Sequence, residues 1–179
     1  MIKKELNFDS GSLESFLLSQ SRSEIEYLRR LYAKATDLIG ISDNNSYRNQ
    51  GIDIYHRIFS PGASISAGAE KLLKADGPDE WVKVVISALD KYESTQHLIG
   101  TQLVEFSSFE VVENEISSGE AYMTSYLQAW HAWPDNRLRV VIGTYHDTIR
   151  YKPGTGWQID KMHLEHTSTD HRMLGKTFD

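Results

Sequence analysis

The sequence of 179 residues contains no cysteine. A fold made without cysteine has no disulfide, no zinc–thiolate site and no cysteine nucleophile. Positively charged residues are fewer than negatively charged ones: the chain has 19 Lys and Arg and 25 Asp and Glu, which gives a formal net charge of −6. A nucleic-acid-binding surface needs clustered Lys and Arg, so this balance argues against a nucleic-acid partner.

Long hydrophobic runs are missing as well. No stretch approaches the roughly 18 apolar residues that a membrane span requires. The basic start is followed at once by Glu5 and Asp9 instead of the apolar run of a signal peptide. We therefore expect a cytoplasmic protein without a membrane partner. No repeat or Pro/Gly linker divides the chain, so residues 1–179 are expected to form one domain, with its core at about 23–165.

The first half of the chain predicts helices. A short leading helix is expected around Leu13, and Ser23 to Glu26 has the form of a capping box that starts the next one. This second segment carries an apolar stripe with helical spacing and ends at Gly40; the stripe is Ile25, Leu28, Tyr32, Ala35 and Ile39. A loop is predicted at 43–51, long enough to cap a pocket, followed by helices at 52–59 and from Pro78 onward.

From Thr95 onward the sequence pattern is typical of β-strands. β-Branched and aromatic residues predict strands at 95–106, 109–113, 119–133, 138–152 and 157–166, with turns at 114–118, 134–136 and 153–156. One short strand is predicted earlier, at 63–67. Helices followed by antiparallel strands indicate an α+β fold, in which helices pack on one face of a curved sheet and enclose a conical pocket. The other face of such a sheet needs a cover, so we expect a homo-oligomer, either a trimer or a dimer.

Four stretches resemble the SnoaL-like branch of the NTF2-like superfamily, whose members include scytalone dehydratase, bile-acid 7α-dehydratase and hexachlorocyclohexane dehydrochlorinase. They are Leu31–Asp37, with its Tyr-Ala and later Asp, Thr95–Gly100 (TQHLIG), Gly119–Tyr126 and the final hairpin Gly143–Ile159. The resemblance implies the cone fold and a chemistry without cofactors. In that chemistry a His–Asp pair removes a proton, and a leaving group departs or a double bond moves.

By this resemblance, His97 is the expected general base. A neutral imidazole titrates near pH 6.5 and can accept a proton at physiological pH. Asp37 falls in the last turn of its helix, where the dipole disfavours a carboxylate, and it is expected to orient His97. Tyr32 matches a dehydratase tyrosine that binds the substrate or assists the leaving group. The structural alternatives are a packed strand histidine, a solvated helix end and a core tyrosine.

The remaining predicted site residues would bind substrate. Tyr145 and Asp147 share one face of a strand, and an inward Asp147 needs a partner. Tyr122 and Tyr126 share a face of the preceding strand, where lining the cavity and packing in the core are equally open. Met162 completes the set; it stands where some eliminating relatives have a substrate-binding arginine, which argues against an anionic substrate.

The other histidines of the second half are not expected to form a second catalytic group or a metal site. Met123 stands where scytalone dehydratase has its second catalytic histidine, and His131 and His146 are expected to point elsewhere. His163 and His166 lie three apart on a predicted strand, so they point to opposite faces and cannot share an ion. No metal is therefore expected, and the resemblance implies no cofactor.

Together with the resemblance, these residues predict a cofactor-independent lyase of aromatic catabolism that acts on an apolar, aromatic or polycyclic small molecule. Dehydratase-type elimination and retro-aldol loss of formaldehyde both fit. A ketosteroid-type isomerase or polyketide cyclase would use the same base. The alternative, which is a binding protein instead of an enzyme, is a non-catalytic domain of the same cone fold that binds a small ligand or a partner protein. The enzyme hypothesis requires His97 and Asp37 to meet at a buried cavity.

Overall fold

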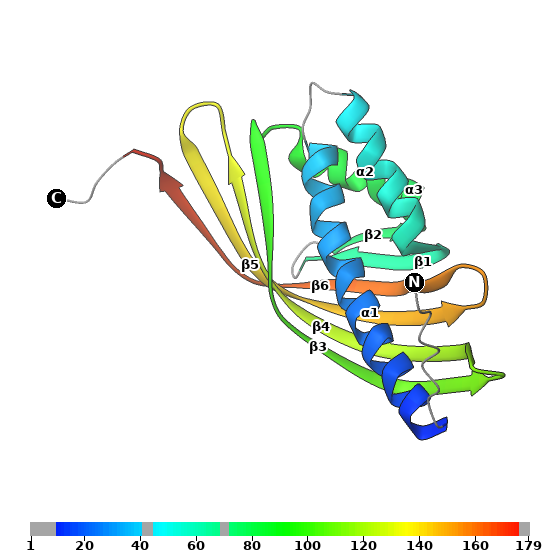
Figure 1. The fold of residues 1–179 in the computed structure, drawn as a ribbon. Coiled ribbons are helices and arrows are strands. Elements are labelled where there is room, and N and C mark those ends of the chain that lie inside the picture. The colour runs from blue at the N-terminus through cyan, green and yellow to red at the C-terminus, as the bar shows by residue number, and fades with distance from the viewer. Residues whose placement is uncertain (1–9, 41–44, 69–71, 176–179) are drawn as a thin grey trace, which may run out of the picture.

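The computed structural model describes residues 10–40, 45–68 and 72–175, which form three helices and one six-stranded sheet. The helices are α1 (Ser10–Gly40), α2 (Asn45–Ile58) and α3 (Pro78–Leu89). The strands are β1 (Phe59–Ala67), β2 (Leu73–Asp76), β3 (Ser94–Val112), β4 (Glu115–Ala132), β5 (Arg137–Lys152) and β6 (Gly156–Met173). Their order is β2-β1-β6-β5-β4-β3, antiparallel except for the β1–β6 pair. Figure 1 shows the helices on the concave side of the curved sheet, which confirms the predicted α+β cone.

Helix α1 crosses the sheet as one continuous helix (Figure 1). Its predicted apolar stripe is buried in the core, where Ile25, Tyr32 and Ile39 are at most 3% exposed. The predicted capping box is wrong, because Ser23 lies inside the helix. Its hydroxyl donates a long 3.4 Å hydrogen bond to the carbonyl oxygen of Ser19, one turn back, which is how a serine is accommodated within a helix.

The loop predicted at 43–51 is also wrong, because α2 begins at Asn45; residues 43 and 44 lie outside the described residues. Gly51, the last residue of the predicted loop, is buried where α2 packs on α1. A Cβ at this position would lie 2.7 Å from the carbonyl oxygen of Ala35 and 2.7 Å from Cγ1 of Ile39. The glycine therefore lets the two helices approach closely.

The strands are longer than the sequence predicted. Strand β3 continues through Ser107, where a bulge shifts the register without ending the pairing. The turn from β3 to β4 consists of Glu113 and Asn114, which have positive φ angles of 52° and 69°, as a two-residue hairpin requires. Strand β6 runs on to Met173. The short strand β2 was not predicted, because its four mostly exposed residues carry no alternating pattern.

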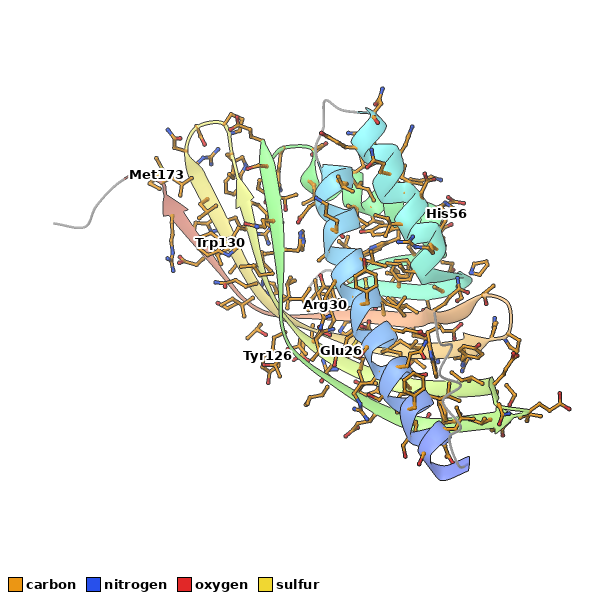
Figure 2. All side chains as sticks on the ribbon, in the orientation of Figure 1. Glu26, Arg30, His56, Tyr126, Trp130 and Met173 are labelled. Atoms are coloured by element: carbon orange, nitrogen blue, oxygen red, sulfur yellow. The ribbon has the colours of Figure 1, made fainter. Side chains whose placement is uncertain are left out.

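The two faces of the sheet differ sharply along β4. Tyr122 and Tyr126 are 42% and 57% exposed, and Figure 2 shows Tyr126 on the side of the sheet away from the helices. The positions between and beside them are buried against the helices: Ala121, Met123, Ser125, Leu127 and Ala129. This alternation decides which side chains reach the space between the helices and the sheet.

Candidate active site

His97 of β3 and Asp37 of α1 meet at the end of the helix. The His97 ring nitrogen Nδ1 lies 2.7 Å from Asp37 Oδ1, and the His97 backbone N–H donates to Oδ2 over 3.2 Å. The side chains are only 8% and 20% exposed. An ionised carboxylate can only accept, so it places the imidazole proton on Nδ1 and leaves Nε2 with a free lone pair. Nε2 is therefore the atom that can take a proton from a ligand.

Close packing at the end of α1 brings Asp37 to the strand. A Cβ on Gly40 would lie 2.8 Å from Cγ2 of Thr95 and 2.9 Å from Cδ1 of Leu89, so the glycine allows the helix end to touch both β3 and α3. The carboxylate sits at the negative end of the helix dipole, which disfavours it by roughly 0.3–1 kcal/mol. Its two hydrogen bonds from His97 offset that penalty.

A cavity of about 210 Å³ lies beside this pair, between α1, α3 and the sheet. His97 lines the cavity, and Asp37 reaches it only through the imidazole. Much of the wall is apolar: Leu73, Trp81, Val84, Val85, Ala88, Leu89, Val141 and Leu164. Polar groups come from Tyr32, Thr36, Tyr92, His131, Arg139, Tyr145 and His166. A mostly apolar chamber with a few polar groups is typical of a small-molecule site.

Two of the predicted site tyrosines line this cavity. The Tyr32 hydroxyl accepts a 3.1 Å hydrogen bond from Trp81 Nε1, and its ring stacks on Tyr55 with centroids 5.3 Å apart. Tyr145 meets Tyr32 edge-on at 5.5 Å. Burial raises the pKa of Tyr32 and raises that of Tyr145 well above its usual value. Both phenols are therefore protonated near neutral pH and can donate a hydrogen bond.

A buried ion pair lies behind these tyrosines. Arg29 of α1 donates from Nε to Asp147 Oδ2 over 3.1 Å and from Nη2 to Oδ1, and both side chains are 0% exposed. Asp147 and Met162 were predicted to bind substrate, but neither lines the cavity. Arg29 engages the Asp147 carboxylate, and its Nη1 lies 3.4 Å from the Met162 sulfur. Both predictions are corrected: these side chains hold Arg29 in the core.

The same guanidinium holds the tyrosines in place. Its central carbon lies 3.9 Å from the ring centroid of Tyr145 and 4.5 Å from that of Tyr32. Burial is the largest single effect and lowers the pKa of Arg29, but the charge of Asp147, the neighbouring tyrosines and the hydrogen bonds to Asp147 together raise the pKa above its ordinary value. A permanent cation thus packs against both phenols that border the cavity.

His131 of β4 also lines the cavity, contrary to the expectation that it points elsewhere. Its Nδ1 lies 2.8 Å from the Thr95 hydroxyl, and its ring meets the His97 ring edge-on at 5.5 Å. Burial, followed by the charges of His97, Arg139 and Lys91, lowers the pKa of His131 to about 3, so it is neutral at physiological pH. The signal was available, since His131 is eight residues from Met123 and a period of two places both on one face.

Tyr122 and Tyr126 do not line this cavity, because both point from the outer face of the sheet. There the Tyr122 hydroxyl lies 2.8 Å from Nδ1 of His146, whose Nε2 lies 3.0 Å from a Glu165 carboxylate oxygen. The prediction that a 43–51 loop caps the pocket fails too, because none of residues 45–51 lines it.

Arg139 of β5 is a second cavity residue that the sequence reasoning missed. The resemblance pointed to an arginine only on the last strand, at the position of Met162. Arg139 lines the cavity from the neighbouring strand, and its Nη1 donates to the Tyr92 hydroxyl over 3.3 Å. Arg139 is six residues from Tyr145 on the same strand, and a period of two places both side chains on the same face of the sheet. This spacing is the sequence signal that could have identified Arg139 as a cavity residue.

Within the part of the chain that the structure describes, no three His, Cys, Asp or Glu side chains gather as metal ligands would. None of the helices of that part is long and apolar enough to cross a membrane.

Comparison with known proteins agrees with this fold. The SnoaL-like domain family matches residues 52–163, so the chain belongs to this family, in the SnoaL-like branch of the NTF2-like superfamily. No curated protein matches the sequence at a significant level.

Solved structures show the same fold at low identity. A candidate scytalone dehydratase from Novosphingobium aromaticivorans is 19% identical with a TM-score of 0.62, over 90% of this chain and 97% of the other. LinA is 13% identical with a TM-score of 0.65, over 93% and 98%. A cystatin-like protein of unknown function from Nostoc punctiforme is 14% identical with a TM-score of 0.56, over 90% and 96%.

Proposed function

We propose that this protein is a cofactor-independent lyase for an apolar, aromatic or polycyclic small molecule, with His97 as its general base. The observation that carries the proposal is the 2.7 Å contact between His97 Nδ1 and Asp37 Oδ1 at the wall of a largely apolar cavity. The dehydratase name of one structural neighbour supports the same class of chemistry. A base held in the reactive tautomer beside a largely apolar cavity is what carbon deprotonation needs.

The elimination proceeds in one proton cycle. His97 Nε2 takes a proton from a carbon next to a carbonyl group or aromatic ring, and the electron pair of that C–H bond forms the new double bond as the C–O bond breaks. Asp37 stabilises the imidazolium formed. Tyr32 or Tyr145 donates a hydrogen bond to the departing oxygen. That oxygen receives the proton from the imidazolium and leaves as water, which restores the enzyme.

Loss of formaldehyde uses the same base on a different proton. His97 takes the hydroxyl proton of a hydroxymethyl group. The bond between the hydroxymethyl carbon and the neighbouring carbon then breaks, and the hydroxymethyl carbon leaves as formaldehyde. The electron pair stays on the carbon next to the ring. It either takes the proton back from the His97 imidazolium or forms a double bond as a neighbouring hydroxyl group departs, takes that same proton and leaves as water. The two reactions differ in the bond that breaks, so their products distinguish them.

A panel of aryl alcohols and aryl propane diols tests the proposal. The new conjugated double bond is followed by ultraviolet absorbance, and formaldehyde by its colour reaction with acetylacetone. His97→Ala should lower kcat roughly 10²- to 10⁴-fold, the usual contribution of a general base. Asp37→Asn should lower it less. His146→Ala, on the outer face, is the matched control and should leave kcat unchanged. A His97→Ala variant that is folded and retains most activity refutes the mechanism.

A further inference from the structure

One end of the cavity gathers three polar side chains from separate elements. Tyr92 follows α3, His131 belongs to β4 and Arg139 to β5, and all three line the cavity. The rings of Tyr92 and His131 stack, with centroids 4.8 Å apart and planes inclined by 26°. Arg139 Nη1 donates to the Tyr92 hydroxyl over 3.3 Å. Stacking and hydrogen bonding therefore fix these groups relative to one another before a ligand arrives.

Among the described residues, no carboxylate forms an ion pair with Arg139. No Asp, Glu or Lys appears among the described residues that line the cavity. Its protein partner is a neutral phenol, which leaves most of the five guanidinium N–H donors for a ligand. A half-buried cation without a counter-ion is unfavourable, and an anion from the ligand would relieve it.

The neighbours add donors and positive charge. Lys91 Nζ lies 5.2 Å from the Tyr92 ring centroid. The low pKa of His131 has Arg139 and Lys91 among its causes, after burial and His97, which indicates a positive potential at this end of the cavity. The Thr95 hydroxyl can donate to His131 Nδ1, which then places the imidazole proton on Nε2. In this tautomer His131 presents an N–H donor to a ligand oxygen.

We infer that Arg139, Tyr92 and His131 form a carboxylate-binding subsite, so the substrate is a ring-bearing carboxylic acid. This inference replaces the expectation, drawn from Met162, that the substrate is not anionic, because Arg139 supplies a cation from another strand. A guanidinium binds a carboxylate through paired N–H donors, a geometry that a neutral hydroxyl or amide does not match. The His131 and His97 rings are 5.5 Å apart, so a carboxylate held here places the attached carbon skeleton next to the proposed base. The inference rests on the proposed function only in taking this cavity as the substrate site.

A binding experiment tests the subsite without requiring turnover. Naphthalene-2-carboxylate and naphthalene-2-carboxamide are nearly equal in shape and differ in charge. Isothermal titration calorimetry of the wild-type protein should show the carboxylate binding about tenfold more tightly, as expected for a charge-assisted hydrogen bond. Arg139→Gln should bring this ratio close to one while changing carboxamide affinity little. Arg139→Lys should restore part of the preference.

Two variants separate the alternatives. Arg137→Gln removes the same charge two residues away on the same strand, from a side chain paired with Asp135, and should keep the preference. His97→Ala should also keep it, so a failed mechanism and a failed subsite give different results. Equal binding of both probes to the wild-type protein, binding of neither at millimolar concentration, or a preference that survives in Arg139→Gln would overturn the inference.

Discussion

Removing one partner of the Arg29–Asp147 pair should be among the most destabilising single substitutions in this protein. Asp147→Asn keeps the shape of the side chain but leaves the guanidinium buried without a counter-ion. Because both side chains are 0% exposed, the full effect of breaking a buried pair applies, about 3–5 kcal/mol. A domain of this size loses roughly 2–4 °C in Tm per kcal/mol, so Tm should fall by about 6–20 °C.

The partner substitution should depend on pH. Arg29→Met leaves the Asp147 carboxyl buried, and burial raises its pKa. A carboxyl whose pKa is higher in the folded than in the unfolded state favours folding at low pH, and this contribution is lost as pH rises through the folded-state value. Arg29→Met should therefore lose less stability at pH 5 than at pH 7. The double variant Arg29→Met/Asp147→Leu has no buried charge and should be more stable than either single variant at pH 7.

Urea denaturation followed by circular dichroism measures these free energies of unfolding. The exposed pair Arg150–Glu120 is the control, and Glu120→Gln should change stability by no more than about 1 kcal/mol. An Asp147→Asn variant that loses less than about 1 kcal/mol would refute the reasoning, as would a double variant whose loss equals the sum of the two single losses.

Two further predictions concern His131 and the outer face of the sheet. The pKa of His131 is lowered to about 3 by burial, whereas an unfolded chain binds this proton near pH 6.5, so the free energy of unfolding should fall by roughly 2–5 kcal/mol as pH drops through this interval. His131→Phe should flatten that part of the pH profile in urea denaturation, and an unchanged slope contradicts the prediction. Leu98, Tyr126 and Ile142 are exposed on the outer face, where we propose that copies of the chain associate. Light scattering should show a trimer or dimer that Tyr126→Glu dissociates and Tyr27→Glu, on α1, does not; a monomeric wild-type protein contradicts this.

Features that depend on one buried face could be predicted from the sequence. The stripe from Ile25 to Ile39 gave the course of α1 over the sheet, and Pro78 marked the start of α3. Boundaries set by a neighbouring element could not be predicted. Gly51 has turn-like composition around it, and only the nearness of α1 explains a glycine within a helix. Ser23 has a capping pattern that the preceding helical segment overrides.

The site shows the same division. His97 and Asp37 were predicted from a resemblance together with their chemistry, whereas the buried Arg29–Asp147 pair joins positions 118 residues apart and has no local signal. The aromatic character of Tyr122 and Tyr126 suggested inward positions, whereas the alternation along β4 places both on the outer face. Strand geometry alone, followed from one inward position, would have assigned them to the outer face.

Helix α1 contributes three groups to the centre of the molecule: Arg29 to the ion pair, Tyr32 to the cavity wall and Asp37 to the imidazole. Adjacent members of this series are separated by three and five residues along a single rigid rod, so an axial slip of one residue, about 1.5 Å, would displace all three together. Assembly of the proposed site therefore depends on the correct docking of α1 as a whole. A chain that has collapsed without docking α1 would have the sheet but not the contact between His97 and Asp37 on which the proposed mechanism depends.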